Sequence, residues 1–514
     1  MKISIVTQQI NNNIQQIHST KKRTVTQTPS FKGSDAFFNE NYGAAMVHIY
    51  SMDKLKKETQ QFPADIKYRE QLLINAGLNP KDQHKIRSIV GPQEIKKIMS
   101  DFQKDEANFS TGENWKNVNN GDMRANMHMH TVASDGSLTV KELLDKAAIY
   151  ANDVANDKLK KAEPFVVGIT DHDTTESAQE AIKIIERNPY KYRNLRVVLG
   201  AEMTTFNNIS TDLVGEKPTN VHVLVYGIDP NEKTFKSFID GTKEKKLGIQ
   251  KMMVDSANET YKNIFGKDNF YSVQEAKHQY NAVNKNILGI HNAMTSYFDT
   301  KFAVEEVILK DKKITKELKK HNVPTESDDF MLMLKEFRTS IDGNNRVLSP
   351  EKSLPEFISV YTDIKEESVK DLLEKKLNQG KLADYHQALK NNLEEYKIGI
   401  EPKHNYMPTF ETLYNGLKGQ KNVLIGIAHP IDTLKNVKNE EKRYDFLESL
   451  FSNFKKGCKE KAKFFEAYYQ SYKPLRKEFK EKPETIKFMD NISKVFKLFK
   501  TGSADTHGMN IFIR

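Results

Sequence analysis

Residues 165–173 read Phe-Val-Val-Gly-Ile-Thr-Asp-His-Asp, an apolar run that ends in charged side chains. A run this short and this rich in β-branched residues is typical of a buried parallel strand. Helical stretches flank it, from about 139 to 153 and from about 175 to 187. This alternation predicts an α/β fold built on a parallel sheet. Four further runs of the same kind are 197–200, 223–226, 423–428 and 464–468.

The composition changes along the chain and predicts three regions. Residues 1–35 are rich in Gln, Asn, Ser, Thr and Lys, which predicts a disordered leader. Residues 36–118 have apolar side chains at helical spacing and predict a helical N-terminal extension. Residues 119–514 are expected to form the α/β domain, interrupted from about 231 to 415 by a Lys- and Glu-rich helical insertion.

The 514-residue chain carries a formal net charge of +10 and has a pI of about 9.0. A basic surface favours phosphate esters, nucleotides or nucleic acid as partners, although lysine-rich helices that are merely solvated explain the charge equally well. Cys458 is the only cysteine, which excludes an intramolecular disulfide and a zinc site made of thiolates. No apolar run approaches the roughly 20 residues that span a bilayer, and the N-terminus lacks the apolar core of a secretory signal. We therefore expect a cytoplasmic protein that does not enter membranes.

The densest chemical signal is the stretch 127–136, Met-His-Met-His-Thr-Val-Ala-Ser-Asp-Gly. Alternate residues of a strand share a face, so His128 and His130 are expected to point the same way and to converge on one cation. Asp135 lies in the following turn, from which its carboxylate can reach the same cavity. Further His and carboxylate residues stand at or beside other strands. They are His172, Glu202, His222, His429, Asp505 and His507.

These nine side chains are expected to meet at one place. In parallel β/α barrels the carboxyl ends of the strands form one mouth, where functional residues collect. Six imidazoles and three carboxylates exceed the needs of one ion and predict two or three divalent ions, with Mn preferred and Zn or Fe as alternatives. Each residue taken singly has an ordinary alternative, a core or surface histidine, or a helix cap for Asp171 and Asp173. His222 fits least well, because it precedes its apolar run instead of ending it.

The motifs resemble, in kind and in order, those of the polymerase-and-histidinol-phosphatase (PHP) superfamily. The resemblance covers about 120–230 and 405–510 and is closest to the subgroup that acts on nucleoside 3′,5′-bisphosphates and RNA 5′ ends. It implies a distorted (β/α)7 barrel with a trinuclear metal site. The matching segments are 128–136, Thr-Asp-His-Asp-Thr-Thr at 170–175, Gly-Ala-Glu at 200–202, His222, Ala-His-Pro at 428–430, and Gly-Ser-Ala-Asp-Thr-His at 502–507.

The resemblance also implies which side chains share an ion. His128, His130, Glu202 and Asp505 would surround the first ion. Glu202 would bridge to a second ion held by His222 and His429, and the third would be held by Asp135, His172 and His507. The chain departs from the family pattern at Ala504, an extra residue in its motif, and at Gly289, which stands where the subgroup has an arginine two residues before the position of His291. A glycine there removes a bidentate phosphate clamp.

The expected activity is the metal-dependent hydrolysis of phosphate esters, in particular phosphomonoesters of nucleotides or related small phosphates. A metal-bridging water would attack phosphorus in line, Glu202 would organise the ions, and His429 or Asp505 would move a proton. His291, Lys403 and His404 are candidate phosphate contacts by position alone. One alternative is an exonuclease or phosphodiesterase that acts on short oligonucleotides, including RNA. A second is a non-catalytic binding protein on the same barrel. The sequence predicts no particular protein partner.

Overall fold

The structure is a computed structural model that describes eleven segments of the chain, all within one compact unit, Lys57–Arg514. The segments are 62–104, 125–156, 165–209, 218–268, 270–275, 287–342, 349–394, 407–437, 442–469, 483–503 and 505–507. The predicted leader 1–35 lies outside them, as do Lys403 and His404. The boundaries expected at 35, 118, 231 and 415 stay predictions.

Seven strands form one sheet whose spatial order is the chain order. The neighbours pair in parallel except at β4, which runs antiparallel to both β3 and β5. The strands are β1 (Ala125–Asn126), β2 (Phe165–Ile169), β3 (Leu195–Asn208), β4 (Pro218–Tyr226), β5 (Leu424–Ile427), β6 (Ala462–Tyr469) and β7 (Phe499–Ser503).

The first and last strands meet and nearly close the sheet. Just beyond β1, Met129 pairs in parallel with Thr506, and the His130 amide donates to the Thr506 carbonyl at 3.0 Å. The Thr506 amide donates in turn to the His128 carbonyl at 3.2 Å. The predicted α/β fold with a distorted seven-stranded barrel is therefore confirmed. The expectation of parallel strands throughout is wrong at β4, whose reversed direction is one source of the distortion.

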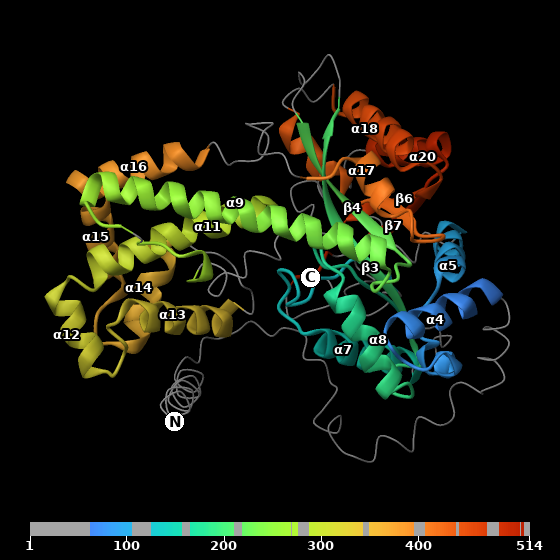
Figure 1. Ribbon diagram of the computed structural model, residues 1–514, viewed down its shortest axis with the longest axis horizontal. Coiled ribbons are helices and arrows are strands. Elements are labelled where there is room, and N and C mark those ends of the chain that lie inside the picture. Colours follow the sequence, from blue (N-terminus) through green and yellow to red (C-terminus); the bar gives the residue numbers. More distant parts are fainter. Residues whose placement is uncertain are drawn as a thin grey trace. The chain divides into compact units, whose positions relative to one another are not determined.

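Helices cover the outside of this barrel (Figure 1). Strand β2 is buried along its whole length, which is why it reads as one continuous apolar run. Gly168 is needed there, because a Cβ at this position would lie 2.0 Å from the Met127 carbonyl oxygen. The covering elements are α7 (Val140–Asn156), α8 (Glu176–Arg187), α17 (Phe410–Gly416), η8 (Pro430–Asn436), α18 (Arg443–Cys458), η10 (Lys459–Lys461) and α20 (Pro483–Phe496).

Three N-terminal elements pack against the end of the barrel where the parallel strands begin. They are α4 (Pro63–Asn75), η3 (Pro80–Ile86) and α5 (Pro92–Lys104). Leu72 and Ile95 belong to the barrel core, and the Tyr68 hydroxyl donates to the Ile228 carbonyl, just past the end of β4, at 2.6 Å. These elements therefore lie at the opposite end from the candidate site described below.

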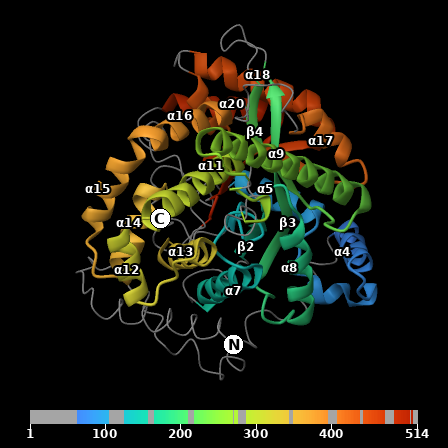
Figure 2. The same ribbon diagram turned by 60° about the vertical axis from the view of Figure 1, so that its left-hand side comes forward.

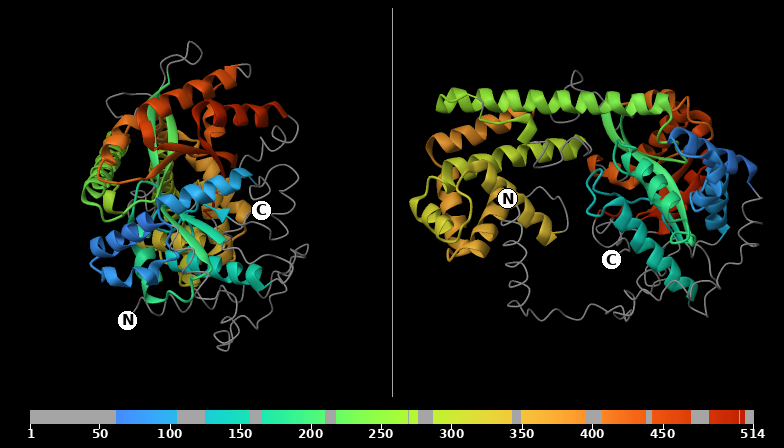
Figure 3. Two further views of the ribbon diagram at one scale, coloured as in Figure 1. Left: turned by 90° about the vertical axis from the view of Figure 1, so that its right-hand side faces the viewer. Right: turned by 60° about the horizontal axis from the view of Figure 1, so that its bottom comes forward.

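A second hydrophobic core is made almost entirely of helices between β4 and β5 (Figure 2). Helix α9 is one unbroken helix that belongs to both cores (Figure 3). Its Phe235 and Ile239 pack in the barrel core, whereas Met253 and Tyr261 pack in the second core. None of the described helices is long and apolar enough to cross a membrane. The helices of this group are α9 (Lys233–Phe265), α11 (Ile287–Ala303), η6 (Val304–Ile308), α12 (Lys312–Lys320), α13 (Ser327–Asp342), α14 (Pro350–Tyr361), α15 (Glu366–Leu377) and α16 (Gly380–Glu394).

Candidate metal centre

The structure brings all nine sequence-predicted candidates into one cluster at the carboxyl ends of the parallel strands. His222 reaches this mouth because β4 is antiparallel, so that the residue before its apolar run lies where the other strands end. The His222 carbonyl accepts the Ala428 amide at 3.0 Å, next to His429. The odd position of His222 in the sequence thus follows from the direction of its strand.

Four side chains have the geometry of a coordination shell. His128 Nε2 and His130 Nε2 lie 3.0 Å apart. Asp505 Oδ1 is 3.3 Å from the first nitrogen and 3.0 Å from the second. Glu202 Oε2 is 3.2 Å and 3.3 Å from the same two atoms. Ligand atoms about 2.0–2.1 Å from one metal ion lie roughly 3.0–3.4 Å from one another in octahedral or tetrahedral geometry. The donor set and its spacing therefore fit one divalent ion.

The other oxygen of Glu202 faces a second group. Glu202 Oε1 is 3.0 Å from His222 Nδ1 and 3.1 Å from His429 Nε2. Because its two oxygens face different groups of imidazoles, Glu202 has the arrangement of a carboxylate that bridges two ions. Among the described residues, Glu202 Oε2 accepts no hydrogen bond although it is fully buried. A buried carboxylate oxygen without a hydrogen bond fits a metal ligand.

The third group surrounds Asp135. Its Oδ1 is 3.2 Å from His507 Nε2, and its Oδ2 is 3.7 Å from His172 Nε2. His130 Nδ1 is 3.6 Å from Asp135 Oδ1. We do not assign His130 to this third group, because a neutral imidazole has one lone pair and that of His130, on Nε2, faces the first group. His172 lies between two groups, since its Nδ1 is 2.9 Å from Glu202 Oε2. The described structure thus contains three merging groups of imidazoles and carboxylates that could hold several ions.

The cluster has a fully buried part, which we call the floor, and a partly exposed part, which we call the rim. His128, His130 and Glu202 have no exposed side-chain surface, whereas the side chains of His429 and His507 are 12% and 32% exposed. Burial alone would raise the pKa of Glu202, but His172 and His128 beside it hold that pKa well below its usual range. Burial likewise opposes the charged form of His130, yet the carboxylates of Asp505 and Glu202 beside it raise its pKa to about 10. The carboxylates therefore stay ionised and hold cations next to them.

Glu466 completes the centre and is absent from the sequence-predicted set. It is fully buried on β6 and accepts from His128 Nδ1, which lies 3.1 Å from Oε1 and 3.2 Å from Oε2. The His429 amide also donates to its Oε2, at 2.9 Å. By accepting the hydrogen bond from His128 Nδ1–H, Glu466 keeps the proton on that nitrogen and leaves the Nε2 lone pair facing the first group. A carboxylate inside the apolar run 464–468 is a signal in the sequence, because a buried charge needs a partner.

Two further carboxylates fix the loops that carry the candidates. Asp171 accepts the Thr131 amide at 2.7 Å and the Ser134 hydroxyl at 2.5 Å, which shapes the turn after the His128 and His130 pair. Gly136 is needed in the same turn, because a Cβ there would lie 2.3 Å from the His130 carbonyl oxygen. The hydrogen bonds of Asp171 therefore favour a role in shaping the loop beside the site over a role as a helix cap.

Asp173 accepts the Thr204 amide at 2.9 Å and the fully buried Lys246 ammonium of α9 at 2.5 Å. Its backbone has a φ of 49°, and His429 and Asp505 also have positive φ values, 29° and 47°. Positive φ is costly for residues other than glycine and tends to cluster at functional sites. Three such residues in or beside one cluster show that the surrounding structure imposes these positions.

The remaining candidates are not part of this cluster as described. His291 belongs to α11, but its side chain lies outside what the structure describes, as do residues 403 and 404. A separate group of Glu317, His321 and Asp363 lies at the surface, and the Lys320 ammonium already bridges Glu317 and Asp363 at 3.1 and 2.8 Å. The phosphate contacts expected from the sequence stay predictions.

Comparisons with known proteins yield distant structural matches only. No family model and no curated protein sequence matches the chain. One matching structure is an amidohydrolase from Chromobacterium violaceum with bound sulfate and no metal, 17% identical over 76% of this chain and 89% of that chain, with a TM-score of 0.37. Another is a protein from Bifidobacterium adolescentis named as a proposed metal-dependent phosphoesterase, 16% identical over 75% of this chain and 88% of that chain, with a TM-score of 0.33. At these values neither protein assigns a function to this chain.

Proposed function

We propose that this chain is a metal-dependent hydrolase of phosphate esters. The observation that carries the proposal is the position of Glu202, with one oxygen beside His128 and His130 and the other beside His222 and His429. Adjacent ion sites joined in this way suit the displacement of a group at phosphorus, because one phosphate can contact both ions.

The ions, once bound, would acidify a water molecule and neutralise charge on the phosphate. The mixed imidazole and carboxylate donors favour Mn, with Zn or Fe as alternatives. Glu202 would keep the two ion sites at a fixed separation. His429 is proposed to move a proton, because it reaches Glu202 from the partly exposed rim and its Nδ1 lies 3.6 Å from Asp432 Oδ2. Asp505 is the alternative proton carrier.

The proposed substrate is a small phosphorylated molecule, in particular a nucleotide monoester. Two features support it: the resemblance of the motifs to the bisphosphate phosphatase subgroup, and the net charge of +10, which favours anions. His291, Lys403 and His404 remain the proposed phosphate contacts. A short RNA is the second candidate substrate, since the same charge would also attract a nucleic-acid strand. The third hypothesis, a non-catalytic binding protein, requires a degenerate site, whereas all nine proposed ligands are present and clustered.

A substrate panel on protein reconstituted with Mn tests these hypotheses. The panel contains p-nitrophenyl phosphate, nucleoside monophosphates, a nucleoside 3′,5′-bisphosphate and a 5′-labelled short RNA, and metal content is measured on the same samples. Release of phosphate from the monoesters or the bisphosphate supports the proposal. Shortening of the RNA without phosphate release from small esters would favour the exonuclease.

Matched variants make the test specific to the cluster. Glu202→Gln and His128→Ala should abolish turnover and lower the metal content, while Glu94→Gln, which alters a carboxylate of α5 that pairs with Arg196 of β3 at 3.1 Å, should leave both unchanged. Full turnover by Glu202→Gln would contradict the proposed centre. Protein that retains metal but turns over no ester in the panel would leave the binding protein as the better description.

A further inference from the structure

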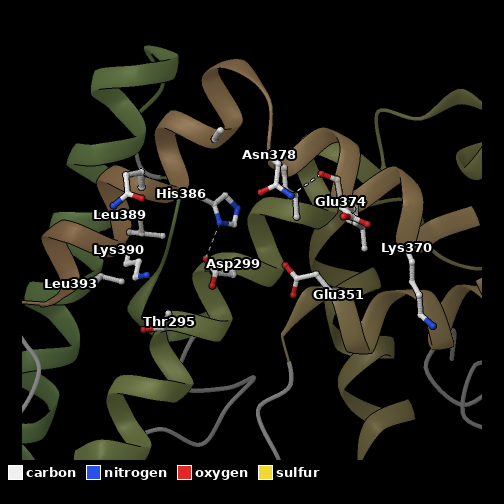
Figure 4. Close-up of a pocket in the computed structure, with 14 residues that line it drawn as sticks. Thr295, Asp299, Glu351, Lys370, Glu374, Asn378, His386, Leu389, Lys390 and Leu393 are labelled. Atoms are coloured by element: carbon white, nitrogen blue, oxygen red, sulfur yellow. Dashed lines mark hydrogen bonds and ion pairs between the residues drawn. The ribbon is translucent and has the colours of Figure 1, made fainter. Parts of the chain in front are cut away.

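A cavity of about 760 Å³ lies among four helices of the second core, and none of the nine candidate ligands lines it (Figure 4). The helices are α11, α14, α15 and α16. Its volume falls in the range of about 300–1,000 Å³ that is usual for sites that bind small molecules. Part of its lining is apolar, with Leu373, Leu377, Leu389 and Leu393. Such a surface can take up a short hydrocarbon chain.

The polar part of the lining is centred on two carboxylates from facing helices. Asp299 comes from α11 and Glu351 from the first turn of α14. Among the described residues, neither forms an ion pair with a lysine or an arginine. Lys370 also lines the cavity, but its ammonium pairs with Glu366 and Glu367, at 2.9 and 3.6 Å. The cavity thus holds two nearby carboxyl groups that the described lysines and arginines do not pair.

A histidine adds a third acceptor beside them. His386 Nδ1 lies 3.9 Å from Asp299 Oδ1, and both side chains are 27% exposed. Figure 4 shows the His386 ring, Asp299 and Glu351 pointing into the same space. With its Nδ1 proton directed toward Asp299, the ring presents Nε2 as an acceptor. That nitrogen is buried and has no hydrogen-bond partner among the described residues.

The ionisation of these groups agrees with the geometry. Burial, reinforced by the charge of Glu351, raises the pKa of Asp299 to about 7, and burial lowers the pKa of His386. His386 is therefore neutral at pH 7, and Asp299 holds a proton for part of the time. The proton on Asp299 thus neutralises a carboxylate that a bound cation could neutralise instead.

We propose that this cavity binds a small organic cation that consists of a primary ammonium group on a short apolar chain. The ammonium group has three N–H donors, one each for Asp299, Glu351 and His386 Nε2. The chain would lie along Leu373 and Leu377. This proposal is independent of the phosphoesterase proposal, because it concerns other residues and is tested by binding.

Calorimetric titration of the full-length protein with n-hexylamine tests the proposal, with 1-hexanol and hexanoate as matched neutral and anionic probes. Hexylammonium should bind at least about tenfold more tightly than either probe, as a charge-assisted hydrogen bond requires. Asp299→Asn and Glu351→Gln should each weaken its binding about tenfold. Asp384→Asn, which removes an exposed carboxylate of α16 that does not line the cavity, should have no effect. Equal binding of the three probes, or binding of none, would overturn the proposal.

Two further measurements locate the cation. Binding of hexylammonium should tighten between pH 6 and pH 8 as Asp299 loses its proton, and this dependence should be absent in Asp299→Asn. The titratable groups that line the cavity or act on Asp299 are Glu351, Lys370, Glu374, His386, Lys390, Tyr271 and Tyr385. Ala383→Leu, which fills the cavity from α16, should abolish binding while thermal unfolding shows the fold intact. A flat pH profile in the unmodified protein, or unchanged binding in Ala383→Leu, would exclude this cavity as the site.

Discussion

Replacement of Glu466 by Gln should weaken metal binding without removing any proposed ligand. Glu466 uses both carboxylate oxygens, since it accepts from His128 Nδ1 at 3.1 and 3.2 Å and from the His429 amide at 2.9 Å. Glutamine has nearly the same shape but offers one acceptor oxygen and two N–H donors. Placed as Oε2, its oxygen still lies within reach of both donors, but the NH2 group then replaces Oε1 and points a donor at His128 Nδ1–H, and the negative charge is lost.

The size of the effect follows from this loss. A hydrogen bond to a charged acceptor is worth about 1.5–3 kcal/mol, and tenfold in affinity corresponds to about 1.4 kcal/mol. Glu466→Gln should therefore weaken the tightest bound ion about 10- to 100-fold, which is the usual effect of losing a group that orients a metal-bound imidazole. The loss should fall on the group that contains His128, because Glu466 no longer selects the tautomer of that ring.

Competition with a chromophoric chelator measures the affinity for Mn or Zn, and thermal unfolding of the metal-free protein controls for the fold. Glu94→Gln is the matched control, because it alters a partly buried carboxylate of α5 that pairs with Arg196 of β3 away from the cluster. Unchanged metal affinity in a folded Glu466→Gln protein would refute the reasoning, since His128 would then need no acceptor to present its Nε2. A loss of equal size in Glu94→Gln would show that the effect is not local.

Three other outcomes are expected. Removal of metal with EDTA should lower the melting temperature, and an ion restored at 100 times its Kd should stabilise the fold by about 2.7 kcal/mol. Because the pKa of His130 is raised from 6.5 to about 10, its contribution to the stability of the metal-free protein is complete below pH 6.5 and is lost as pH rises through 10. Metal binding should therefore release a proton from His130, which calorimetry in buffers of different ionisation enthalpy detects. Asp173→Asn should destabilise the fold by about 3–5 kcal/mol in urea unfolding, because Lys246 stays buried without its partner, and the added change Lys246→Met should restore part of the loss.

The candidate ligands can be found from the sequence because their positions follow from strand geometry. His128 and His130 share a face two residues apart, His429 follows its apolar run directly, and His172 stands three residues after the end of its run. A barrel brings such strand ends to one mouth, so residues hundreds of positions apart become neighbours. The direction of β4 is not encoded in the same way. Its apolar run 223–226 is fully buried, and the pattern of a fully buried run does not indicate whether the strand is parallel or antiparallel to its neighbours.

Lys246 shows why other parts of the centre escape sequence analysis. It stands in a lysine-rich stretch of α9, next to the exposed Lys245, and no local feature separates the two. Its burial depends on Asp173, 73 residues away along the chain. A tertiary contact of this kind is visible only once the helix has been placed against the barrel.

The buried ion pair of Lys246 and Asp173 connects the helices between β4 and β5 to the metal centre. Lys246 lies on α9 between the segment that packs in the barrel core and the segment that packs in the second core. Its partner Asp173 adjoins His172 and is hydrogen-bonded to the segment of β3 that carries Glu202. Without Lys246, a fully buried carboxylate with positive φ would remain beside the ligands and lack its cation. Because burying an unpaired charge is costly, α9 supports the metal centre itself as well as the second core that follows it.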